Sequence, residues 1–191
     1  MAYELKSARY LAADILRAVL EPGDTAVDAT MGNGHDTALL CSLVGPSGMV
    51  YAFDIQAAAI EATKSRLASE GYLNRAVLFR LGHEHMGEKV KVPIKAITFN
   101  LGWLPGGDHR ITTRTETTLS GIRQALELLQ PLGVLVICAY PGHPEGDREK
   151  DAVTEFLSGL SPREYNVLAH RFINAGFGAP LCFAVQKQVQ R

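Results

Sequence analysis

Apolar positions along this chain follow two periods that alternate in a regular order. A spacing of three or four residues predicts helices over about 7–20, 57–70, 115–130 and 147–160, and another helix that carries Leu40 and Leu43. Short, nearly continuous apolar runs predict buried strands over about 25–28, 49–53, 76–81, 95–100 and 134–140. Strands that alternate with helices predict an α/β domain built on a parallel sheet.

The first predicted strand ends in a tight glycine turn that leads into a helix. Residues 28–37 read Asp-Ala-Thr-Met-Gly-Asn-Gly-His-Asp-Thr. Gly32 and Gly34 allow the backbone to turn sharply and to approach a ligand, because neither has a Cβ. Asp36 or Thr37 is the expected N-cap of the helix. A strand, a glycine turn and a helix N-terminus together form a nucleotide-type binding corner.

The residues around this corner favour S-adenosyl-L-methionine (SAM) over a nucleotide that carries phosphate. No Gly-Lys-Ser/Thr of a P-loop follows, and Thr37 takes the place of the third glycine of a dinucleotide motif. Asp28 in the strand and Asp54 after the next strand are carboxylates, which suit the ammonium, sulfonium and ribose hydroxyls of SAM. A dinucleotide site and a structural turn without a ligand remain alternatives.

We expect the cofactor to contact residues at four strand ends. Asp54 would accept hydrogen bonds from the ribose hydroxyls, would cap the next helix, or would do both, and Ile55 would lie against the adenine. His83-x-His85 lacks a third metal ligand nearby, so no metal is expected. The predicted cofactor-binding set is Asp28, Thr30, Met31, Gly32, Asn33, Gly34, Asp36, Thr37, Asp54, Ile55, Gln56, Gly82, His83 and Asn100.

The fourth predicted strand ends at Asn100, and Trp103 follows three residues later. This spacing resembles the Asn-Pro-Pro-Tyr loop of methyltransferases that act on amino groups. An amide oxygen orients the substrate nitrogen, while an aromatic face stacks on the base that carries it. A loop cap at Asn100 with core packing of Trp103 is the alternative. The candidate catalytic residues are Asn100, Trp103, Asp108 and His143, the last two for the amine proton.

The C-terminal part predicts two consecutive strands, over about 164–172 and 180–187, without a helix between them. Such strands form an antiparallel hairpin, and a hairpin at the sheet edge distinguishes SAM methyltransferases from dehydrogenases. We therefore predict a Rossmann-like class I SAM-dependent methyltransferase fold in one domain, residues 1–191. Its sheet is expected to have seven mostly parallel strands, with helices on both faces and a C-terminal antiparallel hairpin.

The composition limits which partners and which cellular compartment we expect. A net charge of −1 over 191 residues argues against a basic coat, so RNA binding would need a local patch. Cys41, Cys138 and Cys182 lie far apart in apolar runs, which predicts free buried thiols. No apolar run is long enough to span a membrane, and the N-terminus has no signal-peptide core. We expect a cytoplasmic protein, or an organelle form without its transit segment.

Four ordered motifs, within 28–37, 52–56, 100–108 and 140–143, resemble one bacterial and plastid family long labelled rRNA methylases. That family includes tRNA methyltransferases that complete 5-methylaminomethyl-2-thiouridine at the wobble position. The resemblance implies a SAM-dependent fold, a homodimer and a tRNA substrate that is methylated on the aminomethyl nitrogen. By motif it assigns three residues to SAM and four to the substrate side: Gly32, Asn33 and Asp54, and then Asn100, Trp103, Asp108 and His143.

The sequence departs from this family on the substrate side. Pro144-Glu145-Gly146 stands where the family tends to have a Gly-Gly pair, and the segment Asn174 to Pro180 has one proline instead of two. These departures bear on the identity of the modified base more than on the cofactor. Two other functions also stay open: a SAM methyltransferase for rRNA or a small molecule, and a non-catalytic RNA-binding module on the same fold.

Overall fold

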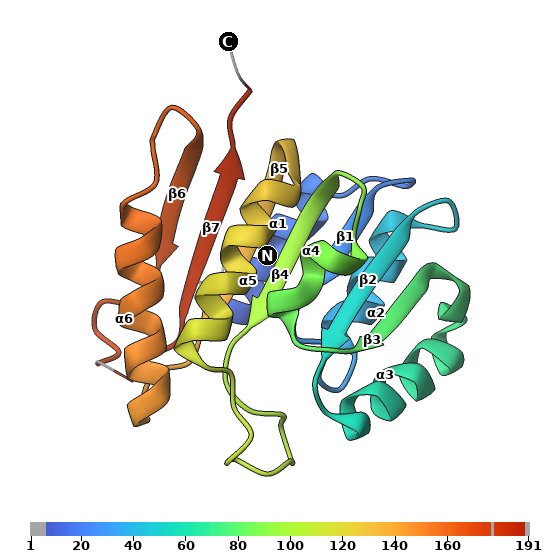
Figure 1. The fold of residues 1–191 in the computed structure, drawn as a ribbon, viewed down its shortest axis with the longest axis horizontal. Coiled ribbons are helices and arrows are strands. Elements are labelled where there is room, and N and C mark those ends of the chain that lie inside the picture. Colours follow the sequence, from blue (N-terminus) through green and yellow to red (C-terminus); the bar gives the residue numbers. More distant parts are fainter. Residues whose placement is uncertain (1–6, 177, 190–191) are drawn as a thin grey trace, which may run out of the picture.

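Seven strands form one sheet in the order β3-β2-β1-β4-β5-β7-β6 (Figure 1). The computed structural model describes residues 7–176 and 178–189. Only β7 runs against its neighbours, so the predicted mostly parallel sheet with a C-terminal antiparallel hairpin is confirmed. The strands are β1 (Thr25–Asp28), β2 (Met49–Asp54), β3 (Ala76–Arg80), β4 (Ile94–Asn100), β5 (Leu129–Ala139), β6 (Tyr165–His170) and β7 (Leu181–Lys187).

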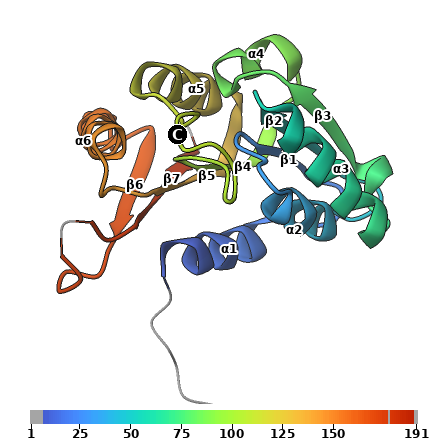
Figure 2. The same cartoon turned by 90° about the horizontal axis from the view of Figure 1, so that it is seen from below.

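Helices cover both faces of the sheet, as Figure 2 shows. One layer contains α1 (Ala8–Val19), α2 (His35–Val44) and α3 (Ala57–Glu70). The opposite layer contains α4 (Met86–Lys89), α5 (Thr115–Leu128) and α6 (Pro144–Ser158). Two short 3₁₀ turns, Leu73–Arg75 and His83–His85, lie before β3 and before α4. Each parallel strand thus returns to the sheet through a helical crossover, as parallel pairing requires.

Side chains of each central strand alternate between two core clusters, because successive strand residues point to opposite faces of the sheet. Val27 and Ile97 pack into the cluster under α5 and α6, while the neighbouring Ala26 and Ala96 pack into the cluster under α1 and α2. All four side chains are fully buried. This explains why the strands read as continuous apolar runs: neither face of the sheet is left to water.

The connection between α5 and β5 differs from the sequence prediction. The helix was expected to continue to residue 130 and the strand to begin at 134, whereas α5 ends at Leu128 and β5 begins at Leu129. Leu129 pairs with Ile94, and the ladder then shifts register before Ala96. The earlier start is a tertiary effect, because β4 supplies the pairing partner.

The cysteines, the candidate metal ligands and the apolar character of the helices bear on what this chain could bind. Cys41, Cys138 and Cys182 are buried free thiols, as predicted. Within residues 7–176 and 178–189, no three His, Cys, Asp or Glu side chains are grouped so that they could hold a metal ion. In the same residues, no helix is both long and apolar enough to cross a membrane.

Candidate active site

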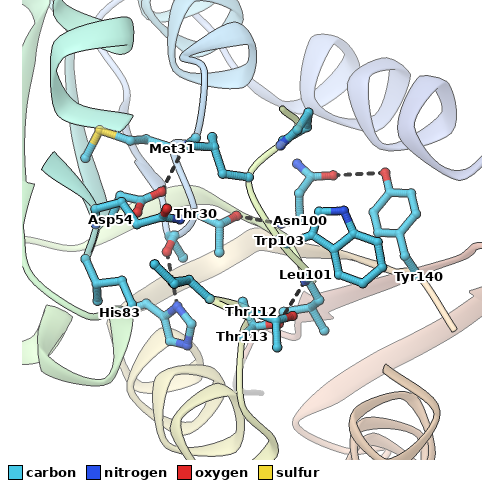
Figure 3. A pocket seen from close by; sticks show the side chains of 18 of the residues that line it. Thr30, Met31, Asp54, His83, Asn100, Leu101, Trp103, Thr112, Thr113 and Tyr140 are labelled. Atoms are coloured by element: carbon cyan, nitrogen blue, oxygen red, sulfur yellow. Dashed lines mark hydrogen bonds between the residues drawn. The ribbon is translucent and has the colours of Figure 1, made fainter. Parts of the chain in front are cut away.

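A cavity of about 570 Å³ lies beyond the carboxyl ends of the central strands (Figure 3). This is the edge where ligands bind in doubly wound sheets. Its walls come from the loops after β1, β2, β3, β4 and β5. The predicted site residues that line it are Thr30, Met31, Gly32, Asn33, Asp36, Asp54, Ile55, Gln56, Gly82, His83, Asn100, Trp103 and His143.

The glycine turn after β1 begins α2 without a side-chain cap. Gly34 is the N-cap, with a φ of 78°, and the helix begins at His35. A Cβ on Gly34 would lie 2.8 Å from the Cα atom of Thr63 in α3, so close packing also requires glycine. The prediction that Asp36 or Thr37 caps this helix is therefore wrong, because both side chains bond to other partners.

Asp28 lies behind the cavity and is fully buried. Its carboxylate accepts hydrogen bonds from the Thr37 hydroxyl at 2.6 Å and from the backbone N–H of Thr30 at 3.2 Å. Burial, followed by the nearby Asp36 carboxylate, raises the pKa of Asp28 to about 7. Asp28, Thr37 and Gly34 are not among the cavity-lining residues. The Asp28 carboxylate holds the turn that forms the cavity wall.

Asp54 joins the loops after β1 and β2. Its carboxylate accepts from the backbone N–H of Gly32 at 3.1 Å and from that of Gln56 at 2.9 Å. The N-cap of α3 is Gln56, so Asp54 supports the start of that helix from outside the cap position. Burial raises the pKa of Asp54, although the two N–H donors oppose this effect. The carboxylate also lines the cavity, beside the 56% exposed Ile55.

His83 is almost entirely buried between the sheet and α5. Its Nδ1 donates to the backbone carbonyl of Ala29 at 3.2 Å, because a carbonyl oxygen only accepts. Burial lowers the pKa of His83, which keeps the ring neutral. The Nε2 atom then carries a lone pair, and it is buried without a hydrogen-bond partner among the described residues.

Asn100 is held in one orientation by three neighbours. Its backbone N–H donates to the Thr30 hydroxyl at 2.7 Å, and its side-chain Nδ2 donates to the Asp36 carboxylate. The amide Oδ1 accepts from the Tyr140 hydroxyl at 3.4 Å, as the dashed line in Figure 3 marks. The amide oxygen keeps a second lone pair that can accept from a further donor in the cavity, and Nδ2 keeps its second N–H.

Trp103 lies in the loop between β4 and α5, which we call the Trp103 loop (residues 101–113). Its ring stacks on His109 with centroids 4.5 Å apart and contacts the tilted ring of His143 at 4.6 Å. Trp103 is 37% exposed and lines the cavity, so it is not the core residue that the alternative prediction required. Part of its aromatic surface is open to a ligand.

The two candidates for the amine proton differ in placement. His143 is the N-cap of α6, and its Nδ1 accepts from the backbone N–H of Gly146 at 3.1 Å. A neutral ring with this bond carries its proton on Nε2, which makes Nε2 a donor. Asp108 lies on the surface, where it pairs with Arg110 at 2.7 Å, and it does not line the cavity. The Arg110 hydrogen bonds lower the pKa of Asp108.

Sequence reasoning missed several lining residues. Tyr140 follows β5 at the same sheet edge, so its place at a strand end was an available signal. Arg9 of α1 and Arg114 before α5 also line the cavity, and neither forms an ion pair within the part of the chain that the structure describes. No local motif marks Arg9, because its position depends on how α1 packs. Arg114 could be found from the sequence, because it follows Asp108, His109 and Arg110 in a charged patch that predicts phosphate contacts.

Comparisons with known proteins agree with this architecture. The family model described as "Putative rRNA methylase" matches residues 50–186. The chain is 37% identical to the chloroplastic tRNA (mnm5s2U34)-methyltransferase of Arabidopsis thaliana, over 96% of this chain and 70% of that protein.

Two solved structures are also similar. A protein from Clostridium thermocellum described as a "putative rRNA-methylase" has a TM-score of 0.95 and 40% identity, over 97% of this chain and all of that chain. A "putative methyltransferase" from Streptococcus mutans, in complex with SAH, has a TM-score of 0.88 and 36% identity, over 96% of this chain and 99% of that chain.

The buried Asp28 carboxyl predicts a pH-dependent stability. Its folded pKa of about 7 exceeds the ordinary 3.8, so stability from the bound proton is complete below about pH 4. That contribution is lost as the pH rises through about 7, and amounts to up to about 4 kcal/mol. Asp28→Asn stays neutral, so we expect a smaller loss of unfolding free energy between about pH 4 and pH 8.

Urea unfolding of both proteins across this range measures the difference. Parallel stability curves for Asp28→Asn and the unmodified protein would contradict the prediction.

Proposed function

Because the chain belongs to the "Putative rRNA methylase" family and is a SAM-dependent methyltransferase, we propose that it methylates a nitrogen atom in RNA. The proposed target is the aminomethyl group of 5-aminomethyl-2-thiouridine at the tRNA wobble position. The likeness to the Arabidopsis tRNA methyltransferase supports this substrate. The observation that carries the proposal is the presence of Asn100 and Trp103 in one cavity with the glycine turn. A cytoplasmic location and a homodimer stay predictions.

The cofactor half of the site is the corner formed by the loops after β1 and β2. SAM supplies a methyl group on a positively charged sulfonium. The Asp54 carboxylate uses two backbone donors and keeps lone pairs for ribose hydroxyls, and the exposed Ile55 offers an apolar face for adenine. The turn at Gly32 brings the backbone to the cavity wall without a Cβ. These features fit a nucleoside with a diol and no phosphate.

The substrate half is formed by Asn100, Trp103, Tyr140 and Asp36. The free side of Trp103 stacks on the target base, and the Asn100 oxygen accepts a hydrogen from its amine. An alkylamine has a pKa of roughly 10 and must lose a proton before it attacks a methyl group. While His143 caps α6, its Nε2 is a donor and cannot accept the amine proton. The Asp108 carboxylate forms an ion pair with Arg110. Asp36 bonds to Asn100 and lines the cavity. It is therefore our candidate for the group that binds the substrate ammonium and accepts its proton.

The test of the function is incubation of the purified protein with labelled SAM and tRNA from cells that lack the gene. We expect 5-aminomethyl-2-thiouridine to disappear and its N-methyl product to appear in nucleoside mass spectrometry. Parallel reactions contain rRNA from the same cells and tRNA that is already modified. Label in rRNA alone, or no label in tRNA despite measured SAM binding, would overturn the proposed substrate and leave the family assignment intact.

Asn100→Ala removes the oxygen that orients the amine. We expect turnover to fall about 100-fold or more, as for other lost positioning groups. Asp36→Asn keeps the size of the side chain and removes its charge, and we expect a similar loss of turnover. SAM affinity, measured by calorimetry, should stay within about twofold in both variants, since the proposed contacts are with the substrate.

Equal losses in SAM affinity and turnover would instead assign Asn100 and Asp36 to the cofactor.

Arg9 and Arg114 are the proposed phosphate contacts of the RNA. A chain with a net charge of −1 needs such a local patch, and both arginines line the cavity. Each single alanine variant should weaken tRNA binding and lower the slope of log K against log salt by about 0.7–0.9. Arg17→Ala is the matched control for Arg9→Ala. It removes an equal charge from α1, at a residue that pairs with Asp14 and does not line the cavity.

Filter binding at several salt concentrations measures these slopes. The same slope for Arg9→Ala, Arg114→Ala and Arg17→Ala would remove these arginines from the interface.

A further inference from the structure

We propose that Glu149 is a positioning residue that fixes the Trp103 loop over the substrate side of the active site. The inference deepens the proposed function, because the loop is assigned there to the target base. Glu149 lies on α6, outside the cavity lining, and no motif singled it out. It acts through Thr113 on Gly102, the residue directly before Trp103.

Glu149 is a carboxylate buried between two helices and a loop. Only 2% of the residue is exposed. One carboxylate oxygen accepts from the Thr118 hydroxyl of α5 at 2.5 Å, and the other accepts from the Thr113 hydroxyl at 2.8 Å. Burial raises the pKa of Glu149, and the two threonine hydroxyls oppose that rise. Burying a carboxyl group is costly even when it is hydrogen-bonded, and an apolar side chain would join α5 and α6 more cheaply.

Thr113 carries the contact from Glu149 to the start of the Trp103 loop. Its hydroxyl accepts from the backbone N–H of Gly102 at 2.8 Å while donating to Glu149. Its own backbone N–H donates to the Gly102 carbonyl at 3.0 Å. Gly102 has a φ of 118°, which side-chain-bearing residues avoid. The residue directly before Trp103 is therefore tied at both its N–H and its carbonyl oxygen.

Two further residues of α6 and its N-cap contact the Trp103 loop or the residue where α5 begins. Glu145, one turn before Glu149, accepts from the backbone N–H and the hydroxyl of Thr115, where α5 begins. His143, the N-cap of α6, contacts the Trp103 ring itself. Trp103 also forms an isolated antiparallel bridge with Thr112. The position of the indole thus follows from the position of α6.

Two threonines separate loop positioning from general support of the fold. Thr118→Val breaks the bond from Glu149 to α5, while Thr113→Val breaks the bond to the loop. Both substitutions replace one hydroxyl by a methyl group on a partner of the same carboxylate. Thr118 is buried and does not line the cavity, so it is a matched control for a structural effect.

Trp103 provides a direct readout, because it is the only tryptophan in the chain. We expect Thr113→Val and Glu149→Gln to increase acrylamide quenching of tryptophan fluorescence and to lower its anisotropy, with SAM affinity unchanged. Thr118→Val should leave both fluorescence values as they are, while it lowers the unfolding midpoint. With tRNA, Thr113→Val and Glu149→Gln should reduce kcat/KM by about 10- to 100-fold.

Unchanged fluorescence in Thr113→Val, or an equal change in Thr118→Val, would overturn the proposal. Thr113→Val keeps the test available if Glu149→Gln does not fold. The fluorescence measurement needs no RNA, so it separates this inference from the proposed substrate. A loosened indole in a protein that does not methylate tRNA would refute the substrate alone.

Discussion

Parallel strand pairing is the constraint on which the rest of this structure depends. Every crossover between β1 and β5 returns through helical structure, so the carboxyl ends of these strands meet at one edge of the sheet. The chain first builds outward from β1 to β2 and β3, and then crosses back to place β4 on the other side of β1. The loops after β1 and β4 diverge at this point and leave the cavity between them.

Hydrogen bonds from polar side chains fix the positions of the loops around that cavity. Asp28 and Asp54 accept backbone N–H groups of the glycine turn and of the loop after β2, while Asn100 joins the end of β4 to α2 through Asp36. Burial raises the pKa of both Asp28 and Asp54. A buried carboxylate that is ionised needs such donors to offset its loss of hydration. The same hydrogen bonds fix the geometry of the ligand site.

The two halves of the site are supported differently. The cofactor half rests on the turns after β1 and β2, where Asp28 and Asp54 accept from backbone N–H groups of these two turns. The substrate half rests on a long loop that crosses the surface and depends on α6 for its position. This difference explains why a common cofactor corner can accompany varied substrates within one fold: the loop and α6 can change while the corner stays intact.

Much of the fold was predictable because periodicity and turn chemistry are local. The expected limits of α3, 57–70, agree with the structure, and so does the antiparallel hairpin of β6 and β7. The errors in element limits arose from a side-chain cap in one case and from a strand partner distant in sequence in another. α6 begins at Pro144 because the His143 side chain caps it, and β5 begins at Leu129 because Ile94 offers a partner. Proximity in sequence misled in the case of Asp108, whose neighbour Arg110 holds it on the surface outside the cavity.

The sequence by itself determined the order of helices and strands, the glycine turn and the strand-end residues that line the cavity, since each depends on neighbours a few positions away. Only the tertiary structure decided which side chains meet. Asp36 and Asn100 are 64 positions apart, Tyr140 and Asn100 are 40 apart, and Glu149 and Thr113 are 36 apart. These pairs are set by strand register and helix packing, which bring side chains together through contacts spread over the whole core, so no local pattern can specify them.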